Sequence, residues 1–134
     1  MSVHRMHLKG PWDYEFLTAD GETGTVTMPA DWQELFGAVP GRAIFRRRFH
    51  EPTNLDDDER VWIVFDGVAG RGRVTVNGAM LGDVASSPGP QRFDMTAHLL
   101  PFSELLVELE YDPKTDGQPG GLHHPVAIEI ESPD

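Results

Sequence analysis

The dipeptide Asn77-Gly78 constrains the fold of this chain more than any other feature of its sequence. Both residues tolerate a positive φ, which the tight two-residue turn of a β-hairpin requires. Before the dipeptide, Arg73 to Val76 alternates polar and apolar residues with a period of two, as a half-buried strand does. After it, Ala79 to Val84 has the pattern of a returning strand, interrupted by Gly82. The sequence therefore predicts an antiparallel hairpin here.

The residues around this hairpin extend it into a larger antiparallel sheet. Val61 to Phe65 is a continuous apolar run rich in β-branched and aromatic side chains, which is typical of a buried strand. Further strand-like runs are Trp12–Phe16, Thr25–Met28, Ala43–Phe49, Gln91–Thr96, Leu105–Tyr111 and Ala127–Glu131. Asp31 to Phe36 predicts one helical turn with Asp31 as its N-cap. We therefore expect an all-β sandwich of about eight or more strands, with at most a turn or two of helix.

Several short motifs occur in an order that is known from one enzyme family. They are Gly10–Phe16 (GPWDYEF), Pro29–Gln33 (PADWQ), Phe45–Pro52 (FRRRFHEP), Phe65–Val68 (FDGV), Val74–Gly78 (VTVNG), Phe93–Thr96 (FDMT) and Gly120–Val126 (GGLHHPV). Together they resemble the sugar-binding domain of glycoside hydrolase family 2, which lies at the N-terminus of bacterial β-galactosidases and β-glucuronidases. The resemblance spans roughly residues 8 to 131 and implies a jelly-roll β-sandwich of the galactose-binding-like type.

The length of 134 residues fits one domain. We expect residues 1–9 to be an N-terminal tether that can pair at a sheet edge, and residues 10–131 to form a single galactose-binding-like domain. The chain is too short to add the catalytic barrel of the family that it resembles, since such a barrel needs about 250 residues. The glutamate pairs Glu108/Glu110 and Glu129/Glu131 should face solvent, without the buried setting that a glycosidase acid needs. No catalytic residue is predicted, and a hydrolase assignment rests on resemblance alone.

The charge and the residue types argue against several kinds of partner. The net charge of −11 disfavours nucleic acid and anionic membranes, because both need patches of lysine and arginine. The sequence has no cysteine, the acidic run Asp56–Glu59 lacks the spacing of a calcium loop, and adjacent His123 and His124 point to opposite faces of a strand. We therefore expect no metal and no cofactor. No segment has the pattern of a signal peptide or a membrane span, so the expectation is a cytoplasmic protein.

A sugar site in a sandwich of this type is expected at the loops of one end, where polar groups are not used by strand pairing. The segments that should gather there are Asp31–Phe36, Ser86–Gln91 and Lys114–His124. They offer Trp32 as an aromatic plate, with Gln91, Asp116, Gln118 and His123 as partners for sugar hydroxyls. The resemblance instead implies that Trp32 packs inside the sandwich. With so few contacts, we expect weak saccharide binding, on the order of 0.1–1 mM or poorer.

Trp62 is the other candidate for a plate, because it is out of phase with the buried residues of its strand. The alternative is that another segment covers it. Two departures weaken the site that the resemblance implies. Ser86–Gln91 lacks both aromatic residues that the family has there, and His124 stands where the family has an arginine.

Arg47 lies between Phe45 and Phe49 on a strand face that should be buried. A buried charge without a partner is strongly destabilising, so this arginine needs a carboxylate nearby. We expect a structural ion pair with Asp94, because the strand that contains Asp94 belongs to the same sandwich. The alternative is that Arg47 binds an anion or a sugar.

The sequence favours a non-catalytic, carbohydrate-binding-like module, free-standing or with a glycosidase as its partner. The alternative is an interaction or scaffold β-sandwich that has lost the sugar site. A third interpretation makes the chain a fragment of a larger family 2 enzyme. An aromatic plate with convergent polar groups would favour the module, and a flat apolar face would favour the scaffold.

Overall fold

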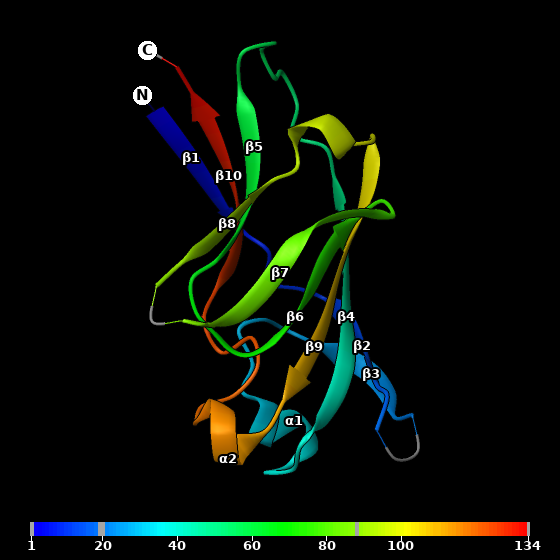
Figure 1. Ribbon diagram of the computed structural model, residues 1–134. Coiled ribbons are helices and arrows are strands. Elements are labelled where there is room, and N and C mark those ends of the chain that lie inside the picture. Colours follow the sequence, from blue (N-terminus) through cyan, green and yellow to red (C-terminus); the bar gives the residue numbers. More distant parts are fainter. Residues whose placement is uncertain (1, 19–20, 88, 134) are drawn as a thin grey trace.

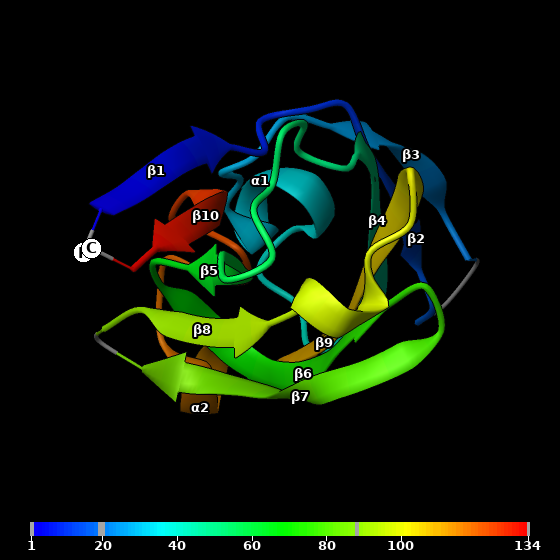
Figure 2. The same cartoon turned by 90° about the horizontal axis from the view of Figure 1, so that it is seen from above.

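The computed structural model describes residues 2–18, 21–87 and 89–133. Within these residues, ten strands form two antiparallel sheets that pack as a sandwich (Figure 1, Figure 2). The small sheet has the order β1-β10-β5-β8, with strands Ser2–His7, Val126–Ser132, Arg60–Phe65 and Gln91–Asp94. The large sheet has the order β3-β2-β4-β9-β6-β7, with strands Thr23–Val26, Trp12–Phe16, Gly41–His50, Phe102–Tyr111, Val68–Val76 and Ala79–Ser87. The predicted all-β jelly-roll sandwich is confirmed.

Strand β9 illustrates how the sequence pattern builds the core. Leu105, Val107 and Leu109 are fully buried, whereas Glu108 and Glu110 lie on the opposite, outer side of the sheet. The same alternation on the other strands fills the space between the sheets with apolar side chains. Each fully buried valine or leucine contributes about 1.5–3 kcal/mol to stability through the hydrophobic effect. The core therefore holds the two layers together.

The hairpin predicted at Asn77-Gly78 joins β6 to β7. Asn77 has a φ of 51° and Gly78 a φ of 83°, the left-handed values that a two-residue turn requires. The Asn77 side chain also bonds to the start of β9. Its Oδ1 accepts from the Glu104 amide at 2.9 Å, and its Nδ2 donates to Ser103 Oγ at 3.1 Å. The turn thus ties the hairpin to the neighbouring strand.

Two short helices, α1 (Trp32–Phe36) and α2 (Pro113–Asp116), close the end of the sandwich that is lowest in Figure 1. Asp31 caps α1 as expected, because its Oδ1 accepts from the Gln33 amide at 3.2 Å. A 3-10 turn, η1 (Thr96–His98), follows β8. No described helix is long and apolar enough to cross a membrane.

Strand β1 lies within the segment expected to be a tether. It pairs with β10 along its whole length and forms one edge of the small sheet, with Arg5 opposite Glu129. The edge pairing that the sequence allowed for residues 1–9 is therefore present in residues 2–7.

Candidate functional site

Two of the three loop segments predicted to form a sugar site, 31–36 and 114–124, lie at the end closed by α1 and α2. The first and third are in direct contact, because the Gly120 amide donates to Asp31 Oδ1 at 3.0 Å and the Trp32 amide donates to the Gly120 carbonyl at 2.9 Å. In the second segment, Ser86 Oγ accepts from the Gly70 amide of β6 at 2.7 Å. The preceding residue of β6, Ala69, forms an antiparallel bridge with Gly121 of the third segment. The first and third segments are therefore in contact, and many of their polar groups bond to one another. The second segment reaches them only through β6, and its Pro88 lies outside the described residues.

Trp32 cannot be the aromatic plate, and this prediction is wrong. Its side chain is only 1% exposed. It packs against Phe16 and Tyr111, with ring centroids 5.8 and 5.1 Å away, and its Nε1 donates to the Val39 carbonyl at 3.0 Å. Because Trp32 is the first residue of a capped helical turn at the open end of the core, it fills that opening. This is the packing role that the resemblance implied.

The predicted hydroxyl partners differ in how free their side chains are. Gln91 is committed to Ala85, since its Oε1 accepts from the Ala85 amide at 3.0 Å and its Nε2 donates to the Ala85 carbonyl at 2.8 Å. Asp116 forms an ion pair with Arg71 at 3.4 Å. Gln118 is exposed, and its side chain makes no hydrogen bond to another described residue. These three residues therefore do not form one open site.

His123 is half-buried, and its ring centroid lies 4.6 Å from that of His124. Its Nδ1 is buried and has no hydrogen-bond partner among the described residues. Burial lowers the pKa of His123, and the neighbouring His124 lowers it further, whereas Asp31 acts in the opposite direction. At neutral pH the side chain is therefore an uncharged imidazole.

The predicted ion pair between Arg47 and Asp94 is absent, and this prediction is wrong. Arg47 does face inward from β4, but the residue opposite it on β9 is Leu105. No carboxylate of the described residues lies within ion-pair distance of its guanidinium, which donates to the Arg48 carbonyl while its Nε has no partner. Burial without a counter-charge lowers the pKa of Arg47.

Asp94 has a different role from the one expected. It lies on β8 in the small sheet, where it accepts from the Thr96 amide at 2.9 Å and lies 3.7 Å from Arg60. Burial acts to raise the pKa of Asp94, but the hydrogen bonds from Thr96 and the charges of Arg60 and His98 lower it overall. Asp94 therefore stabilises the turn after β8 rather than a buried arginine.

Trp62 lies on the outer face of the small sheet and is covered, which is one of the two outcomes considered for it. The guanidinium of Arg92 lies over its ring, 4.3 Å from the centroid. Arg92 is held there by Glu129 and Glu131, each at 3.6 Å, and Arg5 approaches Glu129 to 2.7 Å from the other side. The glutamate pair that should face solvent is thus engaged by arginines from neighbouring strands.

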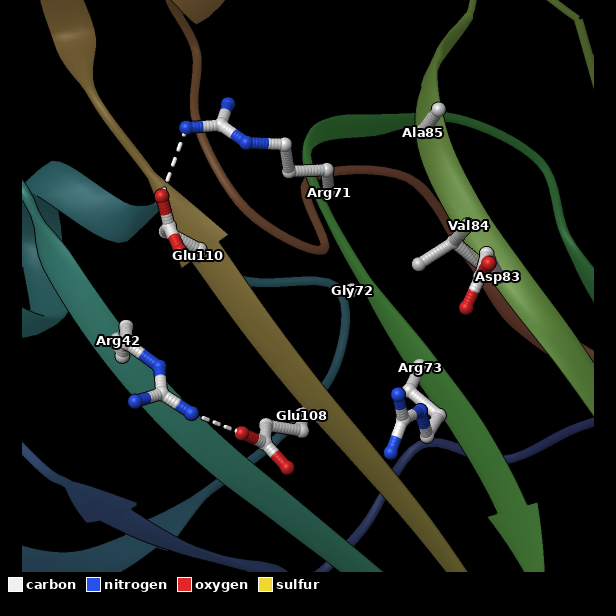
Figure 3. A pocket seen from close by; sticks show the side chains of 9 residues that line it. All are labelled: Arg42, Arg71, Gly72, Arg73, Asp83, Val84, Ala85, Glu108 and Glu110. Atoms are coloured by element: carbon white, nitrogen blue, oxygen red, sulfur yellow. Dashed lines mark hydrogen bonds and ion pairs between the residues drawn. The ribbon is translucent and has the colours of Figure 1, made fainter. Parts of the chain in front are cut away.

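The sequence did not predict a hollow on the outer face of the large sheet (Figure 3). It has a volume of about 580 Å³ and is lined by charged side chains from four neighbouring strands: Arg42 of β4, Glu108 and Glu110 of β9, Arg71 and Arg73 of β6, and Asp83 of β7. Strand pairing explains the gathering, because Arg73 lies opposite Glu108 on one side and opposite Asp83 on the other. Gly72 lies between the two arginines of β6 and adds no side chain.

Ion pairs use part of this hollow. Arg71 Nη2 lies 2.7 Å from Glu110 Oε1, and Arg42 pairs with Glu108 (dashed lines in Figure 3). Arg73 makes no ion pair or side-chain hydrogen bond to another described residue, and neither does Asp83. The hollow therefore combines three guanidinium donors with three carboxylate acceptors, and two of these groups are free to bind a ligand.

Comparison with solved structures identifies the fold. Over 96% of this chain, a β-glucuronidase from Faecalibacterium prausnitzii L2-6, described as FMN-binding, superposes with a TM-score of 0.82 at 21% sequence identity. A putative β-galactosidase from Bacteroides fragilis matches 97% of the chain with a TM-score of 0.77 at 21% identity, and a Ruminococcus gnavus β-glucuronidase matches 96% with a TM-score of 0.79 at 15% identity. The chain has the fold of the N-terminal sandwich of family 2 glycosidases.

At these sequence identities, the match to the solved structures establishes the fold of the chain. The chain spans 22%, 23% and 28% of the three solved chains, respectively. No protein-family model matches the sequence, and no curated protein matches it. Within its described residues, the chain forms the sandwich alone and contains no catalytic barrel.

Proposed function

We propose that this chain is a non-catalytic, carbohydrate-binding-like module that acts beside a glycosidase. The observation that carries the proposal is the charged hollow on the outer face of the large sheet, in a sandwich whose solved neighbours are glycosidases. A sugar hydroxyl both donates and accepts a hydrogen bond, so it is matched by a surface that alternates guanidinium and carboxylate groups. Because the hollow contains as many acidic as basic groups, it favours a polyhydroxy ligand over a simple anion.

The affinity of such a site should be low. The hollow is open to solvent and has no aromatic side chain among its lining residues, so hydrogen bonds to the ligand replace hydrogen bonds to water with little net gain. Binding in the range of about 0.1–1 mM or weaker is expected. This range suits a module that acts by proximity to an enzyme, since linkage raises the effective concentration of the second partner.

Amide NMR shifts recorded during titration with methyl β-galactoside and methyl β-glucuronide test the proposal. We expect shifts that cluster on residues 71–73, 83–85 and 108–110. Arg73→Gln should remove them, because it replaces a free, long guanidinium by a shorter, uncharged amide without breaking an ion pair. Arg48→Gln is the matched control on the same sheet, outside the hollow, where the arginine is paired only with Glu104 at 3.3 Å. Unchanged binding by Arg73→Gln would contradict the proposed site.

The absence of catalysis is the second part of the proposal. Glu108 and Glu110 are each paired with an arginine on an open sheet face, which is not the enclosed, apolar setting in which a glycosidase holds its acid. We expect no turnover of nitrophenyl galactoside or glucuronide. Activity that co-purifies with the protein and disappears in Glu108→Gln or Glu129→Gln would refute this.

An interaction or scaffold domain is the alternative function. It is favoured by one observation, namely that Trp32 is buried in the core and Trp62 is covered by Arg92, so neither tryptophan offers a sugar plate. The same titration separates the two functions. If no amide shifts at roughly 50 mM sugar, some fifty-fold above the upper expected constant, the scaffold function is preferred.

A further inference from the structure

Phe102 is exposed to an unusual degree for a phenylalanine. It is the first residue of β9, and 73% of its surface is accessible, the largest value among the exposed large hydrophobic side chains of the described residues. Leaving a phenylalanine in water forgoes a large hydrophobic stabilisation. The ring packs against His50, which lies opposite it in the strand register with the ring centroids 4.6 Å apart. A flat aromatic surface therefore faces solvent here.

A hollow of about 540 Å³ lies beside this ring. Its apolar wall is formed by Phe102, Pro52, Leu55 and Pro101. The loop after β4 is held against the start of β9 by a hydrogen bond from the Glu51 amide to the Pro101 carbonyl at 3.0 Å. The hollow is therefore built by two segments that are bonded together rather than by one free loop.

The polar side chains of this hollow are uncommitted. Glu51, Thr53 and Asn54 line it, and within the described part of the chain their side chains make no hydrogen bond or ion pair. They offer a carboxylate acceptor, a hydroxyl and an amide within one turn of chain beside the aromatic ring. Elsewhere on the molecule, comparable groups such as Gln91 and Asp116 are bonded internally.

We propose that this hollow is a pyranose-binding subsite, with the sugar's C–H face on Phe102 and its hydroxyls bonded to Glu51 and Asn54. One ring of limited area flanked by a carboxylate and an amide fits a single sugar unit, because a sugar has one apolar face and a polar rim. A docked protein would instead need a wider apolar surface than this ring and its three apolar neighbours provide. The subsite rests on the proposed carbohydrate-binding function, but it is separate from the charged hollow.

The separation of the two hollows has a structural consequence. Phe102 and Glu108 lie on the same outer side of β9, six residues apart, so they are separated by roughly 20 Å at the usual strand rise. One monosaccharide cannot span that distance, and each hollow must bind independently. An oligosaccharide lying along β9 could occupy both and would bind more tightly than a monosaccharide.

The test is an amide NMR titration of the full chain with methyl β-galactoside, methyl β-glucuronide and cellobiose. We expect shifts at residues 50–55 and 101–102, and Phe102→Ala should weaken this binding by about five- to tenfold. Phe102→Trp should retain it, because the substitution keeps an aromatic face. Met80→Ala, which removes another exposed apolar side chain from the same sheet (54% accessible), should leave it unchanged.

Four outcomes would overturn the subsite. Shifts confined to the charged hollow, or equal affinity in Phe102→Ala and the parent, would leave the proposed function intact and exclude Phe102. No shift in either hollow at roughly 50 mM sugar would remove both proposals. Sedimentation that shows a dimer dissociated by Phe102→Ala would instead assign this apolar end to contact between two copies of the chain.

Discussion

Replacing Gly72 by alanine should be the most damaging small substitution in the large sheet. Gly72 lies in the middle of β6, between β9 and β7, opposite Leu109 and Val84. A Cβ added to Gly72 would lie 1.7 Å from the carbonyl oxygen of Glu108, where real Cβ atoms do not approach closer than 3.0 Å. The obstructing atom belongs to the backbone, so no side-chain rotation can relieve the clash. Strand β6 must move away from β9 by more than an ångström.

The expected cost follows from what this movement breaks. About two backbone hydrogen bonds between β6 and β9 would be stretched beyond normal length, at a net cost of about 0.5–1.5 kcal/mol each. Overpacking strain adds about 1–3 kcal/mol. We therefore expect Gly72→Ala to lower the free energy of unfolding by about 2–6 kcal/mol, a large share of the 5–15 kcal/mol typical of a domain.

Urea denaturation monitored by circular dichroism measures this effect. With an m-value of about 2 kcal/mol/M, in the middle of the usual range, the midpoint should fall by roughly 1–3 M. Gly89→Ala is the matched control, because a Cβ there meets nothing within 4 Å and should be neutral or slightly stabilising. A Gly72→Ala midpoint equal to that of Gly89→Ala would refute the close approach of β6 and β9.

Three further predictions concern single side chains. Arg92→Met should expose Trp62, increase acrylamide quenching of tryptophan fluorescence and destabilise the fold by about 1 kcal/mol. Trp12 and Trp32 are 0% and 1% exposed and give a constant background, so unchanged quenching would contradict the proposed cover by Arg92. Burial lowers the pKa of His123 in the folded state, so as the pH drops through about 6.5 the unfolded chain binds more protons than the folded chain, and the free energy of unfolding should fall. In urea titrations from pH 8 to 5, His123→Gln should weaken this pH dependence, and the edge-strand variant His4→Gln should not. Asn77→Ala should lower the free energy of unfolding by about 2–3 kcal/mol, because it loses side-chain hydrogen bonds as well as a residue suited to positive φ. Asn54→Ala, at a φ of 60°, should lose only the stabilisation that comes from the positive φ, so equal urea midpoints for the two variants would refute a bonding role for Asn77.

The strands and the hairpin could be predicted because their signals are local. Alternation of period two in Leu105–Tyr111 places leucine and valine inward whatever strand lies beside them, and Asn77-Gly78 selects its turn from the conformations that the two residues allow. The ion pairs could not be predicted in this way. Arg47 was correctly placed on the inner side of β4, but its neighbour across the sheet is Leu105, because strand order is set by packing between distant segments.

The charged hollow was hidden from the sequence for the same reason. Arg71 and Arg73 repeat with a period of two, as do Glu108 and Glu110, and each pair alone is what any outer sheet face contains. Only the order β4-β9-β6-β7 brings the two pairs together, and that order joins residues up to 68 positions apart, from Arg42 to Glu110. A pattern search within one strand therefore cannot distinguish such a hollow from a solvated surface.

The end of the sandwich expected to bind sugar is occupied by its own closure. Trp32 fills the opening of the core, Asp31 accepts from the Gly120 amide, and the Tyr111 hydroxyl, which donates to the Gly117 carbonyl, also accepts from Gln33. These bonds satisfy the polar groups that a ligand would have needed. Uncommitted charged groups lie instead on the outer face of the large sheet and beside Phe102, whereas this end keeps only scattered free groups such as the Gln118 side chain. Any ligand chemistry of this sandwich should therefore be sought along β9, where outward residues are not required to close the fold.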